Sequence, residues 1–358
     1  MKRYLIFSLS LYFSFSAYAQ TRYYDAKQFP LIGKISEKTE TRYERIPVSI
    51  KGKCRQPVWS LGKNTSGLAV RFRSNSTSVS AKWKLLNNNR MNHMTDTGIK
   101  GLDLYAWEDN RWQFVNSARP DGIENEKNII NNMNPKEREF MLFLPLYDGI
   151  THLEIGIDSL AYIEKPASPF PRTDNPIIIY GTSITQGGCA TRPGMSYANI
   201  LERKLNREII NLGFSGNGKL DYEIAEIMSE RQDAAMFVLD FIPNVHASEI
   251  TEKLSTFIQI LRSKNPATPI VLVETVIFPH ALFDQNTYEV VTLKNKTLHK
   301  EFRALQRRGD KNIHYITTSN LIGSDGEATV DGVHFTDLGF LRFANEVSPI
   351  IEKLIQNK

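Results

Sequence analysis

The sequence predicts an α/β protein, with a five-stranded, parallel, doubly wound sheet preceded by an all-β domain of the β-sandwich or jelly-roll type. Two observations predict this order. Before residue 163, short segments alternate between apolar and polar residues, which is typical of half-buried strands. After residue 176, wholly apolar segments alternate with helical periods, as in parallel strands joined by helices. A chain of 358 residues also exceeds what one hydrophobic core normally fills.

The N-terminal domain is predicted over residues 20–163. Six segments show strand-like patterns: 67–72, 78–83, 102–107, 112–115, 140–144 and 152–157. The four residues from Glu108 to Arg111 separate two of these segments and predict a hairpin turn. Because no helical period interrupts the strands, we expect a sandwich of two sheets.

A proline-rich segment over residues 164–176 marks the predicted domain boundary, since its four prolines favour an extended linker. The α/β domain is predicted over residues 177–358. Its strands are expected at 177–180, 208–212, 235–239, 270–274 and 313–316, and its helices at 196–205, 222–230, 248–261, 288–307 and 338–355. Right-handed crossovers would place these helices on both faces of a flavodoxin-like sheet.

Residues 1–19 have the pattern of a secretory signal peptide. Lys2 and Arg3 form the charged end, residues 5–15 are mostly apolar, and Ala17-Tyr18-Ala19 is a cleavage site of the A-x-A type. The apolar segment is too short to span a bilayer comfortably, although an uncleaved anchor is the alternative. We therefore expect an exported protein, periplasmic or extracellular, with no stable membrane insertion after cleavage.

Charge and cysteine content exclude several classes of function. The formal net charge of +5 falls to +3 without Lys2 and Arg3 and is scattered along the chain, so no nucleic-acid partner is predicted. Cys54 and Cys189 are too few for a disulfide framework or a cysteine-based metal site, but one bridge between them is possible in an oxidising compartment. The seven histidines form no typical metal-binding spacing, and no metal or cofactor is predicted.

The first strand of the α/β domain ends at Gly181-Thr182-Ser183. Open α/β sheets bind ligands at the carboxyl ends of their strands, so Ser183 is a candidate nucleophile on a rigid backbone. Thr182 beside it is a candidate for lining the substrate pocket. The alternative is an ordinary turn in which Ser or Thr caps the next helix.

A nucleophilic serine needs a general base, and that base needs an orienting acceptor. Asp331 and His334 lie between the fifth strand and the last helix, so they share the sheet edge with Ser183. Their spacing lets the Asp331 carboxylate reach the His334 imidazole, hold its tautomer and favour the imidazolium. Taken alone, the same segment is more typical of a turn followed by a surface histidine.

Two further loops at this edge offer donors for a developing oxyanion. Gly216 follows the second strand, and its backbone N–H is approachable because glycine has no Cβ. This loop lacks the Lys-Ser/Thr of a P-loop and the acid of a dinucleotide site. Asn244 follows the third strand, where its side-chain amide can face the oxyanion; the alternative is a local turn after Pro243.

Together, these segments resemble the SGNH, or GDSL-like, hydrolase family over residues 176–356. The four family blocks occur in order as Gly181-Thr182-Ser183-Ile184, Ser215-Gly216, Pro243-Asn244 and Asp331-Gly332-Val333-His334. The resemblance implies Ser183 as nucleophile, His334 as base and Asp331 as its orienting group. It also implies oxyanion donors from the Ser183 and Gly216 N–H groups and the Asn244 side chain.

The departures from the family pattern are limited. Thr182 stands where the family has Asp, Ile184 where it has Leu, and residues 240–244 replace the usual Gly-x-Asn-Asp. A G-x-S-x-G elbow of the α/β-hydrolase type does not fit, because position 185 is Thr.

The segment Gly101-Leu102-Asp103-Leu104-Tyr105 resembles the Gly-x-Asp-Leu-Tyr signature of a β-sandwich that precedes some SGNH domains in exported bacterial esterases. The resemblance implies that the polar loop 87–98 approaches the catalytic edge and helps to shape the substrate pocket, with His93 as a candidate pocket residue; the alternative is a solvated loop and an ordinary buried Asp103. Arg192, in the segment after the nucleophile, is a candidate for binding a substrate carboxylate or hydroxyl, or else an exposed surface arginine.

The sequence thus predicts a secreted serine esterase that hydrolyses small acyl esters, with acetyl esters of carbohydrate as the expected substrates. The carbohydrate part comes from family analogy and the appended β-sandwich. Two alternatives remain. An acyltransferase would resolve the same acyl-enzyme with an alcohol, whereas a carbohydrate-binding protein would carry a degenerate hydrolase domain. Intact Ser183, Asp331 and His334 argue against the second alternative.

Overall fold

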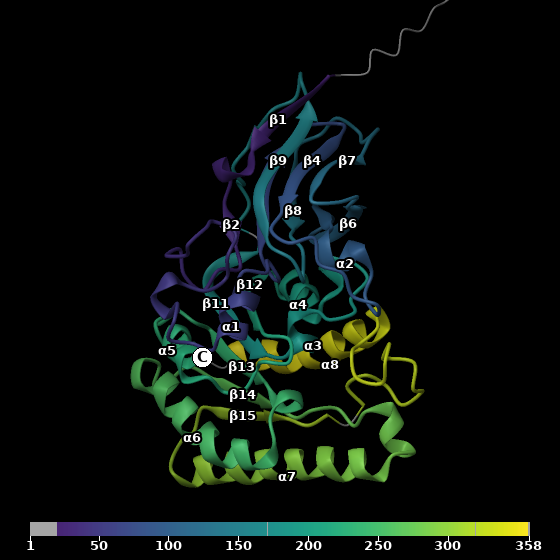
Figure 1. Cartoon of the computed structure of the whole chain (residues 1–358). Helices are drawn as coiled ribbons and strands as arrows, with labels where there is room; N and C mark the ends of the chain where they lie inside the picture. Colours follow the sequence, from purple (N-terminus) through teal and green to yellow (C-terminus); the bar gives the residue numbers. More distant parts are fainter. Residues whose placement is uncertain (1–19, 170, 319, 357–358) are drawn as a thin grey trace, which may run out of the picture.

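The computed structural model describes residues 20–169, 171–318 and 320–356. Two antiparallel sheets form the upper part of the molecule in Figure 1, and the α/β unit forms the lower part. The predicted signal peptide falls on residues 1–19, outside the described residues. Within the described ranges, no helix has the length and apolar character needed to cross a membrane.

The N-terminal half is a sandwich of two antiparallel sheets. One sheet has the order β1 (Thr21–Asp25), β9 (Ile150–Asp158), β4 (Val79–Leu85), β7 (Glu124–Ile130). The other has the order β10 (Ile163–Glu164), β3 (Ala69–Ser74), β8 (Arg138–Phe143), β5 (Leu102–Glu108), β6 (Arg111–Ala118), and β2 (Leu31–Ile32) pairs with β3. Side chains of both sheets, among them Phe72, Trp83 and Phe140, share one buried core, so the predicted sandwich is confirmed.

The hairpin turn between β5 and β6 is also confirmed, since Asp109 and Asn110 both have positive φ, at 51° and 60°. The sequence did not predict β1, β2, β7 or β10. The strand β7 lies at a sheet edge, next to β4, and its first five residues, Glu-Asn-Glu-Lys-Asn, show no apolar alternation. Polar and charged residues are common on edge strands, because an apolar edge would promote aggregation.

The C-terminal half is a five-stranded parallel sheet in the order β12-β11-β13-β14-β15. Its strands are β11 (Arg172–Gly181), β12 (Arg207–Gly213), β13 (Met236–Asp240), β14 (Ile270–Val273) and β15 (Ile313–Ile316). Its helices are α3 (Ser183–Gln186), α4 (Tyr197–Leu205), α5 (Tyr222–Ser229), α6 (Ala247–Lys264), α7 (Gln285–Arg307) and α8 (Asp337–Gln356). Buried residues of α5, α6 and α7 cover one face and those of α4 and α8 the other, which confirms the doubly wound sheet.

Shorter elements complete the chain. They are α1 (Gln56–Gly62), α2 (Asp96–Lys100) and the 3-10 helices η1 (Ala26–Gln28), η2 (Val48–Ile50), η3 (Pro193–Met195), η4 (Ile242–Asn244) and η5 (Pro279–Leu282). Val58 and Trp59 of α1 belong to the same core as α5 and α6. Fully buried Arg45 donates hydrogen bonds to the carbonyls of Asn211 and Gly213 at the end of β12. The segment before β3 therefore packs against the α/β unit.

Glu202 on α4 is a fully buried carboxyl group. Its Oε2 accepts a hydrogen bond from Ile209 N at 3.1 Å, and Oε1 has no partner among the described residues. Burial raises the pKa of Glu202 to about 8, above the value of about 4.3 in an unfolded chain. Between pH values of about 4.3 and about 8, the folded state holds the proton that the unfolded state releases. Glu202 therefore lowers the free energy of unfolding progressively as the pH rises through this range.

Replacement of Glu202 by Gln is therefore expected to reduce the loss of stability between about pH 5 and about pH 8. Glutamine keeps an acceptor for Ile209 N and cannot ionise. Urea unfolding at both pH values measures the effect, with Glu226→Gln on the exposed side of α5 as the control that leaves the pH dependence unchanged. An identical pH dependence in wild type and Glu202→Gln would contradict the prediction.

Candidate active site

Ser183 lies where the buried strand β11 passes into the short helix α3. Thr182 is the N-cap of that helix: its Oγ1 accepts a hydrogen bond from Ile184 N, and its own N–H donates to Thr185 Oγ1, both at 3.3 Å. Ser183 is the first helical residue and is 7% exposed. The strand end and the cap together hold the Ser183 backbone in one place.

These contacts correct the prediction that Thr182 lines the substrate pocket. Thr182 is fully buried, and its hydroxyl is occupied by the first turn of α3. The helix-capping alternative therefore describes Thr182, while Ser183 beside it keeps its hydroxyl available for His334.

His334 and Asp331 meet Ser183 as the sequence predicts. His334 Nε2 lies 2.9 Å from Ser183 Oγ, and Nδ1 lies 2.7 Å from Asp331 Oδ2. The other oxygen of Asp331 accepts the backbone N–H groups of Val333 and His334, at 3.0 and 2.8 Å. Gly332 permits this tight loop, because its φ is +87° and a Cβ there would lie 2.6 Å from His280 Nδ1.

Asp331 is strongly acidic in this setting. Burial raises the pKa of its carboxyl, but the hydrogen bonds from the His334 ring and from the loop N–H groups outweigh burial and lower the pKa to about 2. The carboxylate is therefore ionised at neutral pH and favours a proton on His334 Nδ1, which leaves Nε2 free to accept the proton of Ser183. The arrangement can generate a serine nucleophile.

Gly216 and Asn244 lie on two neighbouring loops that meet. Asn244 Oδ1 accepts a hydrogen bond from Gly218 N at 3.2 Å, and Phe214 N donates to Gly181 O at 3.0 Å. These contacts bring the Gly216 loop to the end of β11. Asn244 ends the local turn η4, where its N–H donates to Phe241 O at 3.1 Å, and its side chain makes the contact between the two loops. No described residue accepts a hydrogen bond from the Gly216 N–H or from Asn244 Nδ2, so both remain free to donate.

His93, from the loop between β4 and α2, lies beside His334, with ring centroids 5.4 Å apart. Its Nδ1 is 3.1 Å from Asn92 Oδ1. The loop of the N-terminal half therefore reaches the catalytic edge, as the resemblance implies. The sequence did not predict that Cys189 would join this group. Cys189 is buried beside both rings, and Cys54 is buried elsewhere, so both thiols are free.

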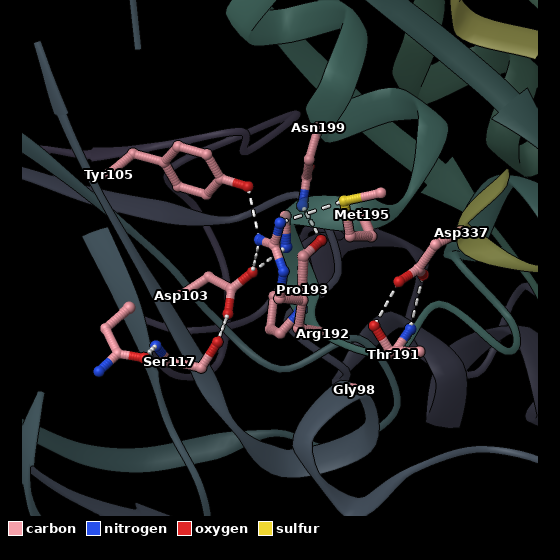
Figure 2. A network of polar contacts seen from close by, with 12 residues as sticks. Gly98, Asp103, Tyr105, Ser117, Thr191, Arg192, Pro193, Met195, Asn199 and Asp337 are labelled. Atoms are coloured by element: carbon pink, nitrogen blue, oxygen red, sulfur yellow. Dashed lines mark hydrogen bonds and ion pairs between the residues drawn. The ribbon is translucent and has the colours of Figure 1, made fainter. Parts of the chain in front are cut away.

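Arg192 binds the N-terminal half of the protein, and this corrects the prediction of a substrate-binding arginine. Its Nη1 donates to Asp103 Oδ2 at 2.7 Å and to Tyr105 OH at 2.6 Å (Figure 2). The guanidinium carbon also lies 3.8 Å from the centroid of the Phe114 ring. Because the side chain is 21% exposed, the alternative of an exposed surface arginine does not describe it either.

The Asp103 carboxylate holds the loop that follows the nucleophile. It is fully buried, and besides Arg192 it accepts hydrogen bonds from Gly194 N at 2.8 Å and Ser117 Oγ at 2.6 Å. In the same loop, Thr191 N donates to Asp337 Oδ1 at 3.0 Å, at the start of α8 (Figure 2). The Gly-x-Asp-Leu-Tyr segment therefore joins the sandwich to the loop beside the catalytic edge.

Sequence reasoning missed a buried carboxyl group beneath the nucleophile. Asp240 ends β13, and its Oδ2 accepts hydrogen bonds from Thr185 Oγ1 at 3.0 Å and Tyr197 OH at 2.8 Å. Burial raises the pKa of Asp240 to about 7. The available signal was a single acidic residue at the end of the wholly apolar segment Met-Phe-Val-Leu, since a buried carboxyl needs partners.

Two family models match the chain. The model of the GDSL-like lipase/acylhydrolase family matches residues 174–352, and a model of the N-terminus of SGNH-hydrolase-type esterases matches residues 21–163. The chain belongs to the GDSL-like lipase/acylhydrolase family. Membership supports hydrolase activity on esters, in agreement with the geometry around Ser183.

Solved structures resemble this acylhydrolase along most of its length. A protein from Bacteroides ovatus described as a GDSL-like lipase is 38% identical with a TM-score of 0.90, covering 94% of this chain and 98% of that one. A salicylyl-acyltransferase from a tetracycline biosynthetic pathway is 19% identical (TM-score 0.76), and a family two carbohydrate esterase from Cellvibrio japonicus is 13% identical (TM-score 0.60), each with the same coverage. These two likenesses show the fold alone. No curated protein matches the chain.

Proposed function

We propose that this GDSL-like acylhydrolase is an exported serine esterase that removes small acyl groups, acetyl above all, from carbohydrate. The observation that carries the proposal is the hydrogen-bonded series Ser183–His334–Asp331, with contacts of 2.9 and 2.7 Å. A serine joined in this way to a histidine and a carboxylate is an activated nucleophile for acyl transfer.

The residues act in two stages. His334 Nε2 takes the Ser183 proton as Oγ attacks the ester carbonyl, and the N–H groups of Ser183 and Gly216 and the Asn244 amide stabilise the oxyanion. His334 then gives the proton to the leaving alcohol, and an acyl-enzyme remains. A water molecule, deprotonated by His334, attacks the acyl carbon, and the acid leaves as Ser183 recovers its proton. Asp331 stabilises the imidazolium in both stages.

The substrate class is supported by the carbohydrate esterase from Cellvibrio japonicus, which shares the fold over 98% of its length. The N-terminal half of the protein also contributes His93 next to His334. The alcohol part of a substrate, here the sugar, therefore has protein surface beside the reacting ester. Export is supported by the signal-like pattern of residues 1–19.

Acetate release from acetylated xylan, acetylated mannan and acetylated monosaccharides tests the proposal, alongside p-nitrophenyl esters of acetate and decanoate. We expect acetate release from at least one carbohydrate and faster hydrolysis of p-nitrophenyl acetate than of the decanoate. Hydrolysis of p-nitrophenyl acetate without release from any carbohydrate would reject the substrate class. Faster hydrolysis of the decanoate would indicate a lipase, and an ester product dominating over acetate in the presence of glycerol would indicate an acyltransferase.

Replacement of Asn244 by alanine is expected to lower kcat by on the order of 10²-fold or more, with little change in KM. The Asn244 amide donor acts on charge that develops only in the transition state, so its loss affects the rate more than substrate binding. Steady-state kinetics on p-nitrophenyl acetate measure the effect. Asn345→Ala, on the exposed side of α8, is the control. An unchanged kcat in Asn244→Ala would contradict the oxyanion role.

A further inference from the structure

Three side chains of the types that bind transition metals, two histidines and a cysteine, converge beside Ser183. One ring nitrogen of His93, one ring nitrogen of His334 and the Sγ of Cys189 all lie within 4.8 Å of one another. The three residues come from separate segments: the loop before α2, the loop after α3 and the loop before α8. Ligands around a tetrahedral zinc ion are about 3.5 Å apart, so small side-chain rotations suffice to close the group around an ion.

The chemistry of the group is that of a zinc ligand set, because imidazole nitrogen and cysteine sulfur are the donors that Zn²⁺ prefers. The His334 side chain is 22% exposed and His93 is partly exposed, whereas Cys189 is buried beneath them at 4% exposure. An ion can therefore reach the two rings from solvent, whereas the sulfur lies in the buried part of the group. Three protein ligands leave the fourth position to water.

We propose that His93, Cys189 and His334 bind Zn²⁺, or another thiophilic divalent ion, and that the bound ion reversibly switches off the esterase. The inhibition part rests on the proposed function; the binding part does not. His334 uses Nε2 toward Ser183 Oγ and Nδ1 toward Asp331 Oδ2.

The bound ion inhibits the esterase by way of either ring nitrogen of His334. If Nε2 binds the ion, the lone pair that accepts the Ser183 proton is donated to the metal instead. If Nδ1 binds it, the single proton of the neutral ring sits on Nε2, which then cannot accept another. In both cases Ser183 loses its base and the acyl-enzyme cannot form.

Metal binding requires the Cys189 thiol to release its proton to solvent. Burial, and after it the nearby Asp331 carboxylate, raises the pKa of this thiol to about 12, so the ion must displace a firmly held proton. The same carboxylate attracts a cation to the group. We therefore expect weaker binding than in a structural zinc site, and full reversal by a chelator.

The experiment has two readouts on the purified protein after treatment with EDTA and removal of the chelator. Equilibrium dialysis against ZnCl₂ measures binding without reference to activity. Initial rates of p-nitrophenyl acetate hydrolysis measure inhibition at the same zinc concentrations. We expect one bound zinc per chain, a fall in rate that tracks its occupancy, and recovery with EDTA. A protein that binds zinc but hydrolyses no ester would leave the site standing and overturn the proposed function.

Cys189→Ala removes one ligand without touching the series Ser183–His334–Asp331. It is expected to weaken zinc binding and inhibition by at least about tenfold, whereas Cys54→Ala, which removes the other buried thiol, should change neither. If Cys189→Ala fails to fold, His93→Ala in the exposed loop replaces it in the dialysis measurement. The proposal is overturned if wild type binds no zinc, or if the variants bind it as tightly as wild type does.

Discussion

Ser183→Ala is expected to lower kcat/KM for p-nitrophenyl acetate by on the order of 10⁴-fold or more. The Ser183 Oγ is the atom that forms the acyl-enzyme, and among the described side chains it is the hydroxyl hydrogen-bonded to His334 Nε2. The stability of the variant should match wild type, since only one partly buried hydroxyl is lost. Wild-type activity in Ser183→Ala would reject the serine mechanism.

Two controls sharpen this result. Ser248→Ala replaces an exposed serine on α6 and should keep full activity. It therefore shows the effect of a serine-to-alanine change that lies away from the site. A fluorophosphonate probe should label wild type at Ser183 and leave Ser183→Ala unlabelled. Absence of labelling in wild type would instead favour a carbohydrate-binding protein whose hydrolase domain is degenerate.

Asp103→Ala is expected to lower the free energy of unfolding by about 3–5 kcal/mol. The change leaves the half-buried Arg192 guanidinium without its carboxylate and removes the acceptor of Gly194 N and Ser117 Oγ. An uncompensated charge and unsatisfied donors in a protein interior cost several times more than a lost surface contact. Urea unfolding curves at constant pH measure the difference.

The chain offers a matched control in Asp325→Ala. Asp325 pairs with Arg342 at the same 2.7 Å, but the two side chains are 46% and 31% exposed. Water solvates such a pair in the folded protein, so its loss should cost no more than about 1 kcal/mol. Equal destabilisation by the two variants would show that Asp103 is not the buried anchor of this loop.

The architecture could be predicted because its signals are local. Apolar segments such as 177–180 and 235–239 are typical of buried parallel strands, and the helical periods between them require crossovers that cover both faces. Ser183 and His334 could be placed together for the same reason, since the carboxyl ends of parallel strands share one edge. The edge strand β7 could not be predicted, because its polar sequence acquires its partner only in the folded sheet.

The sequence by itself determined a sandwich followed by a doubly wound sheet, and a serine, a histidine and an aspartate at one sheet edge. Only the tertiary structure decided that Thr182 caps α3 and that Arg192 forms an ion pair with Asp103. It alone also placed Cys189 beside His93 and His334. The direction of a polar side chain depends on the partners around it, and Asp103 is 89 positions away from Arg192 in the sequence. Such pairings leave no periodic signal, because folding alone brings the two segments together.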